Sequence, residues 1–187
     1  MGRFVLTGER IFLRLAVADD VPSILAFYRR NRWHLAPWEP VRPREFFTPA
    51  HWRRQVRTNR AEWRAGRSVR MFLFERERPG RVIGTVNFSN LVRGVFRACH
   101  LGYALDGASQ GRGRMTEALE LAIAHVFGEL NFHRIMANYI PRNRRSARLL
   151  RRLGFRVEGR AKDYLLIAGR WEDHVLTSRV NRAWRRP

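Results

Sequence analysis

Residues 100–127 read HLGYALDGASQGRGRMTEALELAIAHVF, and the pattern of this stretch changes twice. An apolar strand is predicted at Leu101–Leu105, and a turn containing three glycines follows at Asp106–Gly113. Beyond the turn, apolar residues recur three and four positions apart, which is typical of one helix face; they are Met115, Ala118, Leu119, Ala122, Ile123, Val126 and Phe127. The stretch therefore predicts a strand, a turn and a helix of an α/β fold.

The turn has the composition of an anion-binding site. The first backbone N–H groups of a helix have no partner within it, and the positive end of the helix dipole lies beside them. Residues 110–114 read QGRGR, so two glycines permit close approach to the backbone and two arginines add donors suited to phosphate. We expect a pyrophosphate here; an ordinary strand-to-helix turn is the alternative. The motif is neither a P-loop nor a dinucleotide-binding fingerprint.

Further motifs flank this unit. HLAPWEP lies at 34–40, HRIMANY at 133–139, NRRSARLL at 143–150 and LGFRVEG at 153–159. In this order, and together with the QGxGx turn, they make the chain resemble the GNAT (Gcn5-related) N-acetyltransferases. Over residues 80–180 it is similar in detail to the ribosomal-protein-alanine N-acetyltransferases of the RimJ and RimL type, which modify protein N-termini.

The resemblance implies acetyl-CoA as co-substrate and an amine that attacks the thioester directly. It places Ser146 to protonate the leaving thiolate. The implied cofactor-binding residues are Tyr103, Ala104 and Leu105 along the pantetheine arm, Gln110, Gly111, Arg112, Gly113, Arg114 and Met115 around the pyrophosphate, and Asn143 on the CoA arm. A helix N-cap with a first-turn hydroxyl is an equal alternative for Asn143 and Ser146.

The chain departs from the family's pattern at three positions. Ala108 stands where the phosphate motif usually has Arg or Gln, and Asn138 and Leu150 stand where some protein N-terminal acetyltransferases have a glutamate base and a tyrosine acid. A weak base is sufficient for an α-amine, because its pKa is about 7.7–8.0, against about 10.4 for lysine. An α-amine is therefore the better-supported acceptor.

The acceptor site is expected to use carboxylates and aromatic rings from loops and the last hairpin. Glu39 is the preferred base, because Trp38 and Pro40 flank it and could form the walls of a small pocket. Asp163, Glu172 and Asp173 are further carboxylates that could hold the amine or relay its proton, although a solvated surface position or an ion pair is the alternative for each. The expected substrate-binding residues are Trp38, Glu39, Tyr139, Tyr164 and Asp173.

Composition limits the classes of partner. The chain has 37 Lys or Arg against 16 Asp or Glu, a net charge of +21, and Lys162 is its one lysine. So strong a positive field favours a polyanionic surface, such as nucleic acid or a ribonucleoprotein. The single cysteine, Cys99, excludes an internal disulfide and is expected to be a small buried residue. The six histidines lack metal-ligand spacing, so no metal site is expected.

The whole chain, 1–187, is expected to form a single acetyltransferase domain with a frayed basic tail from about 180. The expected fold class is α/β (α+β), the GNAT fold, with a mixed, mostly antiparallel sheet flanked by helices. A long loop is predicted at 31–47, a turn at 77–80 and a final hairpin turn at Ala168–Gly169. Charges interrupt the N-terminal apolar residues, so we expect a cytoplasmic protein without a signal peptide or membrane span.

These observations lead to one main hypothesis and two alternatives. The main one is N-α-acetylation of a ribosomal protein with a small N-terminal residue such as alanine, with docking to the ribosomal particle through rRNA. One alternative is acetylation of a small amine. The other is a ribosome-assembly or RNA-binding factor that has kept the fold and lost catalysis.

Overall fold

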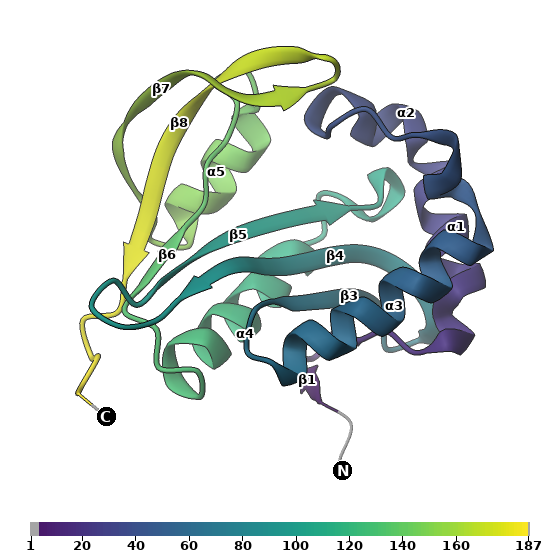
Figure 1. Cartoon of the computed structure of the whole chain (residues 1–187), viewed down its shortest axis with the longest axis horizontal. Helices are drawn as coiled ribbons and strands as arrows, with labels where there is room; N and C mark the ends of the chain where they lie inside the picture. The colour runs from purple at the N-terminus through teal and green to yellow at the C-terminus, as the bar shows by residue number, and fades with distance from the viewer. Residues whose placement is uncertain (1–3, 187) are drawn as a thin grey trace.

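The computed structural model describes residues 4–186, in which an eight-stranded sheet carries helices on both faces (Figure 1). The strand order is β1-β2-β3-β4-β5-β6-β8-β7, and each neighbouring pair is antiparallel except β5 with β6. The predicted mixed, mostly antiparallel sheet is therefore confirmed. The strands are β1 Val5–Thr7, β2 Ile11–Leu15, β3 Val69–Glu75, β4 Arg78–Val92, β5 Ala98–Leu105, β6 Arg134–Met136, β7 Arg156–Ile167 and β8 Arg170–Val180.

The helices bury apolar residues in two separate cores. One core joins α4 and the end of α5 to one face of the sheet, and the other joins α1 and α3 to the opposite face. The α-helices are α1 Val21–Arg30, α2 Arg32–Leu35, α3 Pro49–Arg64, α4 Arg114–Gly128 and α5 Arg144–Arg152; the 3-10 segments are η1 Ala18–Asp20, η2 Ala36–Trp38, η3 Arg44–Phe47 and η4 Gly107–Ser109. No helix within residues 4–186 is long and apolar enough to cross a membrane.

The predicted periodic face of α4 is the buried one. Six of its seven apolar residues are buried, and Phe127, near the helix end, is partly buried against the same core. The helix ends at Gly128, as expected. The continuous row of buried apolar side chains on α4 packs the helix on the sheet and so sets where its first turn lies relative to β5.

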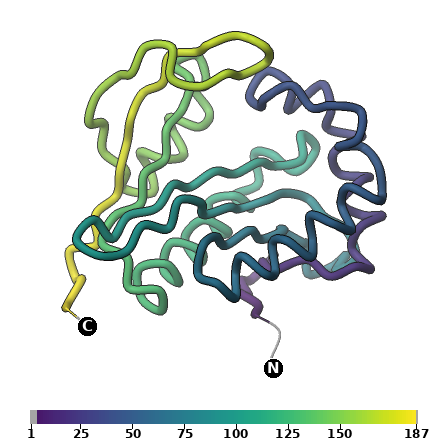
Figure 2. The backbone as a smooth tube through the Cα atoms, in the orientation of Figure 1, coloured from purple at the N-terminus to yellow at the C-terminus, as the bar shows by residue number. Residues whose placement is uncertain are grey.

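The junction of β5 and β6 leaves part of β5 open. The two strands pair only from Ala98 to His100, against Arg134–Met136. Figure 2 shows the backbone segments of β5 and β6 diverging beyond this point. Among the described residues, Leu101–Leu105 pairs with β4 on one edge and with no strand on the other. That open edge leads to the glycine-containing turn.

Two sequence-based expectations were wrong in detail. The segment 31–47 is not one long loop, because it contains α2, η2 and η3; none of these pieces exceeds four residues, too few to produce a helical period. The β3–β4 turn lies at residues 76–77 instead of 77–80. Pro79 and Gly80 fall inside β4, where irregular register leaves them outside the regular pairing.

The basic tail is not frayed over its described part. β8 continues to Val180, and the Asn181 side chain donates to the carbonyls of Phe127 and Phe132. The indole Nε1 of Trp184 then donates to the Asn131 carbonyl at 3.2 Å. The sequence does not reveal these anchors, since the partly buried Asn181 amide and Trp184 indole depend on partners about 50 residues away.

Candidate active site

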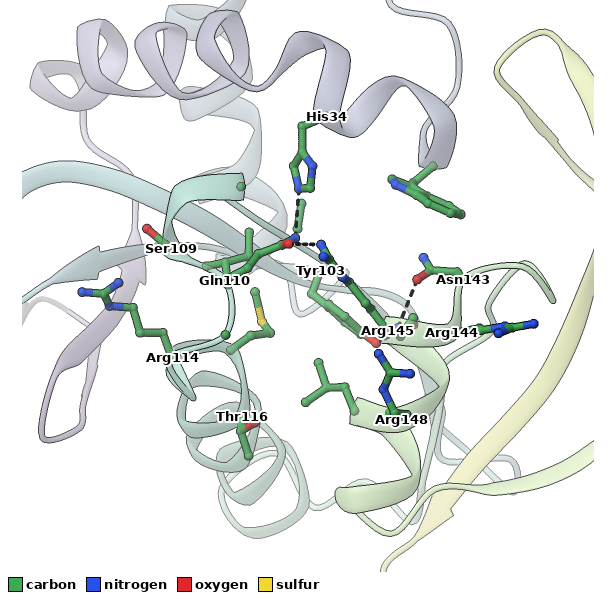
Figure 3. Close-up of a pocket in the computed structure, with 18 of the residues that line it drawn as sticks. His34, Tyr103, Ser109, Gln110, Arg114, Thr116, Asn143, Arg144, Arg145 and Arg148 are labelled. Atoms are coloured by element: carbon green, nitrogen blue, oxygen red, sulfur yellow. Dashed lines mark hydrogen bonds between the residues drawn. The ribbon is translucent and has the colours of Figure 1, made fainter.

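A cavity of about 1080 Å³ lies where β5 ends, between the glycine-containing turn, the start of α4 and α5 (Figure 3). Its lining includes all ten residues predicted to bind the cofactor, together with Ser146 and Trp38. It also includes residues that the sequence analysis missed, chiefly His34, Leu35, Arg142, Arg144, Arg145, Arg148 and Arg152. The strand, the turn and the NRRSARLL helix therefore meet around one site.

The turn presents backbone to the cavity because its glycines adopt left-handed conformations. Gly111 has φ 76° and Gly113 has φ 73°, a region that favours glycine. Gly113 is the N-cap of α4 and has no side chain to satisfy the first N–H groups of that helix. A bound anion can supply the missing acceptor, so the local geometry fits the expected phosphate site.

A buried carboxylate at the start of the turn holds it in position. Asp106 is 3% exposed, and its carboxylate accepts hydrogen bonds from Arg30 at 2.7 Å and Arg81 at 3.2 Å. Burial acts to raise the pKa of Asp106, but the hydrogen bonds and charge of Arg30, with contributions from the Ala108 N–H and Arg81, outweigh it and lower the pKa. The side chain of Asn31 also accepts from the Gly107 N–H at 3.0 Å. The turn is thus tied to α1 and β4.

The Arg114 side chain is engaged in an ion pair, so its expected contact with the pyrophosphate stays a prediction. Its guanidinium pairs with Glu75 at 2.7 Å and is 15% exposed. Figure 3 shows it turned away from the other labelled residues of the cavity. Arg114, the first residue of α4, thus pairs with the last residue of β3 and is also part of the cavity lining.

Positive charge also reaches the cavity from α5. The lining arginines of this helix are Arg144, Arg145, Arg148 and Arg152. Arg145 donates to the side-chain oxygen of Gln110, whose amide nitrogen shares a hydrogen bond of 3.0 Å with His34 Nε2. The run of arginines at 144–152 was the visible signal, but which of them face the cavity depends on how α5 docks.

Two hydroxyl groups meet across the cavity. The Tyr103 hydroxyl on β5 and the Ser146 hydroxyl on α5 share a hydrogen bond of 2.7 Å. Burial raises the pKa of Tyr103 to about 12, although the Ser146 hydrogen bond acts in the opposite direction. Asn143 accepts the Ser146 N–H at 3.1 Å, so it is the N-cap of α5 as well as part of the lining. Asn143 and Ser146 can therefore form the helix N-cap and line the cavity at the same time.

Three of the four predicted carboxylates form ion pairs, and none of the four lines the cavity. Glu39 accepts from Arg42 at 3.0 and 3.1 Å, and Asp173 accepts from Arg160 at 2.7 Å. Glu172 pairs with Arg142 and Arg170, while the side chain of Asp163 has no described ion pair. Among the predicted acceptor residues, Trp38 lines the cavity and Glu39, Tyr139, Tyr164 and Asp173 do not.

The positions that departed from the family's pattern have structural partners. Asn138 donates to the Tyr164 hydroxyl at 3.3 Å and accepts from the Thr177 N–H at 3.2 Å. Leu150 is buried in the core, and Tyr139 forms a bridge with Val175. Asn138 and Leu150 thus link secondary-structure elements and offer no acid or base.

Cysteine and metal chemistry play no part in the proposed site. Cys99 is buried, as predicted, and burial raises the pKa of its thiol to about 12. Within residues 4–186, no group of three or more His, Cys, Asp or Glu side chains is placed to hold a metal ion.

The geometry agrees with comparisons to known proteins. The family model described as "Acetyltransferase (GNAT) domain" matches residues 10–156. The chain belongs to the GNAT acetyltransferase family. It is therefore an acyltransferase, and the cavity beside the QGRGR turn lies within the matched region of this GNAT chain.

Full-length relatives place the chain within this family. It is 44% identical over 179 residues to the [ribosomal protein uS5]-alanine N-acetyltransferase of Escherichia coli, covering 96% of this chain and 92% of the relative. The crystal structure of ribosomal-protein-S5-alanine acetyltransferase from Vibrio fischeri matches with a TM-score of 0.93 and 42% identity, over 98% of this chain and all of the other. Mycobacterium smegmatis RimJ in complex with CoA-disulfide matches with a TM-score of 0.86 and 28% identity, over 94% and 84%.

Proposed function

We propose that this GNAT protein transfers the acetyl group of acetyl-CoA to the N-terminal α-amine of a ribosomal protein, with alanine as the first residue. The observation that carries the proposal is the cavity that joins the QGRGR turn to the Tyr103–Ser146 hydroxyl pair. The 44% identity to an enzyme named for alanine acetylation on uS5, over nearly the whole of both chains, supports the acceptor.

The residues present fit acetyl-CoA. The left-handed glycines and the uncapped start of α4 offer backbone N–H groups to a pyrophosphate, and the α5 arginines add charge. The open edge of β5, Tyr103 to Leu105, can pair with the amides of an extended pantetheine arm, and its N–H groups can receive charge that develops on the thioester oxygen. Acetyl-CoA supplies the activated acetyl group.

The transfer forms an N–C bond and breaks the C–S bond of the thioester. In the proposed mechanism Ser146 donates its proton toward the leaving thiolate, while the Tyr103 hydroxyl donates to Ser146. A thiol with a pKa of about 8.5 leaves readily as a thiolate, so a hydrogen bond contributes much of the required stabilisation. The amine proton passes to water or to a modest base, because an α-amine is already partly neutral near pH 7.

The acceptor is proposed to enter beside Trp38. Arg142 lies 5.5 Å from the centroid of the Trp38 ring and donates to the Pro37 carbonyl at 3.3 Å, and it also pairs with Glu172. Ala168 of the last hairpin donates to the Glu39 carbonyl at 2.9 Å. These contacts hold the 37–39 segment against the hairpin. Glu39 stays a candidate base, with Tyr139, Tyr164 and Asp173 as candidate contacts to a longer acceptor peptide.

The charge supports action on a ribosomal particle. A free ribosomal protein is usually basic and a +21 enzyme repels it, whereas the same protein on rRNA presents an anionic neighbourhood. A ribosome-assembly factor without catalysis is the second candidate, favoured by Asn138 and Leu150 at the positions of the missing base and acid.

The test is to incubate the protein with acetyl-CoA and unmodified small ribosomal subunits and record intact masses of the ribosomal proteins. One protein should gain a single acetyl at its N-terminus, and the Ser146→Ala variant should slow this gain. A parallel reaction with that protein free in solution tests the preference for the particle. Subunit binding without any mass gain would favour the assembly factor and refute the proposed reaction.

A further inference from the structure

A basic and aromatic surface lies at the end of the sheet remote from the cavity. It consists of the β4–β5 loop, residues 93–97, and the C-terminal segment 181–186, and we call it the distal surface. Figures 1 and 2 show the C-terminal segment beside this loop, at the opposite end of β5 from the turn. In the loop, Val95 is fully exposed and Phe96 is 50% exposed. Neither takes part in the proposed acetyl transfer.

The distal surface is held in place by contacts. The Trp184 indole is anchored to the Asn131 carbonyl, and its ring lies 5.5 Å from the Arg97 guanidinium and packs on the edge of His133 at 5.9 Å. Within the loop, the carbonyl of Arg97 accepts the N–H groups of His133 and Arg134. The Arg97 end of the loop and the Trp184 segment of the tail are therefore held in place by these contacts.

The positive charge of this surface lacks internal neutralisation. Among residues 4–186, no carboxylate lies within 4.0 Å of the guanidinium groups of Arg93, Arg97, Arg182, Arg185 or Arg186. Arg134, whose backbone adjoins the loop, pairs with Glu158 and does not count toward this set. The loop and the tail thus bring the five guanidinium groups of this set to the end of the sheet where Phe96 is exposed (Figure 1), and a polyanion would reduce the repulsion between them.

We propose that the distal surface binds a single-stranded segment of RNA. Arginine pairs with phosphate through its planar fork, and exposed aromatic rings stack on unpaired bases. Phe96 is placed for such a stack, Arg93 and Arg97 flank it in the chain, and Trp184 positions Arg97. The arginines of the tail extend the track for phosphates. An anionic membrane is disfavoured, because the exposed apolar side chains at or beside this surface, Val92, Val95, Phe96 and Val180, are outnumbered by the five arginines that have no described ion pair.

This inference deepens the proposed action on a ribosomal particle and rests on it for its biological partner, rRNA. The two sites are separate: β5 runs eight residues between them, on the order of 25 Å. RNA on the distal surface therefore leaves the cavity and its mouth open. The surface would anchor the enzyme to the particle while an acceptor N-terminus reaches Trp38.

The test uses a labelled single-stranded oligouridylate and the full-length protein, with affinity measured across a range of salt concentrations. Phe96→Ala should weaken binding about tenfold without changing the salt slope, since it removes one stacked base. Arg93→Ala should lower the slope of log affinity against log salt by about 0.7, because one phosphate contact is lost. Arg57→Ala on α3, an exposed arginine removed from the patch, is the matched control and should leave the slope unchanged.

Each outcome decides the proposal. An equal slope change in the Arg57 control would mean that only the overall charge attracts RNA and would overturn it, as would full affinity in Phe96→Ala. Binding to anionic phosphatidylserine vesicles that is lost in Phe96→Ala, with unchanged oligouridylate affinity, would assign the surface to a membrane. Acetylation of a free acceptor peptide by the same variants should equal wild type, so failure of RNA binding and failure of the proposed function are distinguishable.

Discussion

Removing the Ser146 hydroxyl should slow acetyl transfer while the fold is kept. In Ser146→Ala the backbone N–H of residue 146 still donates to Asn143, so the N-cap of α5 survives. The thiolate loses one hydrogen bond to a charged acceptor, which contributes about 1.5–3 kcal/mol. The rate of the chemical step should therefore fall about 10- to 150-fold.

The Tyr103 hydroxyl should contribute less, and only through Ser146. Tyr103→Phe keeps the buried ring and removes one neutral hydrogen bond of 2.7 Å, about 0.5–1.5 kcal/mol, so the rate should fall about 2- to 10-fold. Because burial raises the pKa of Tyr103 to about 12, the phenol stays protonated through the neutral range and the substitution should not introduce or remove a titration there.

Single-turnover acetylation of an acceptor peptide, with CoA affinity measured separately, tests the pair. The double variant should be no slower than Ser146→Ala alone, since the tyrosine acts through the serine. Two results would refute the reasoning. One is a Ser146→Ala rate within about twofold of wild type, and the other is a double variant whose losses multiply, because Tyr103 would then act on the substrate by its own route.

Three further predictions concern the phosphate turn and its surroundings. Asp106→Asn should destabilise the protein by about 1.5–3 kcal/mol in urea unfolding. The pKa of Asp106 is lowered in the folded state, so its contribution to stability is present above its unfolded pKa of about 3.9 and is lost as pH falls through the folded value. The difference in unfolding free energy between variant and wild type should therefore close below about pH 3.9. A difference that stays constant with pH would contradict this. Gly113→Ala should cost about 1–2 kcal/mol and raise the KM for acetyl-CoA, because φ is 73°, whereas Gly128→Ala at the other end of α4 should do neither. Arg114→Ala should lower stability through loss of its ion pair and leave CoA affinity within about twofold of wild type. Arg145→Ala should weaken CoA binding in calorimetric titrations. The opposite order of CoA affinities would assign the phosphate contact to Arg114.

Much of the cofactor site was readable because its signal is local. The apolar spacing after residue 114 has the period of a helix, and Gly111 and Gly113 adopt the left-handed conformations that a close turn requires. A strand, a turn and a helix that follow one another within 28 residues must lie close together, so the nine predicted cofactor-binding residues of this stretch all line the cavity. The NRRSARLL motif added α5 through resemblance to the family.

The acceptor side was harder to predict from the sequence, because the positions of its residues depend on partners far along the chain. Glu39 and Asp173 were chosen for chemistry, yet each carboxylate is paired with an arginine. In a chain with so many arginines, nearly every exposed carboxylate has several potential partners, and sequence spacing does not select among them. Tyr164 lies on β7 and Tyr139 forms an isolated bridge with Val175, and both fall outside the cavity lining.

The sequence by itself determined the elements around residues 100–127 and the family to which the chain belongs, since periodicity and turn chemistry act between neighbours. Tertiary structure alone decided that Arg114 faces Glu75, that Arg145 reaches Gln110, and that Tyr103 and Ser146, 43 positions apart, share a hydrogen bond. Such contacts depend on how α5 and β5 pack on the common core. Packing is set by the summed burial of many side chains, which no local spacing records.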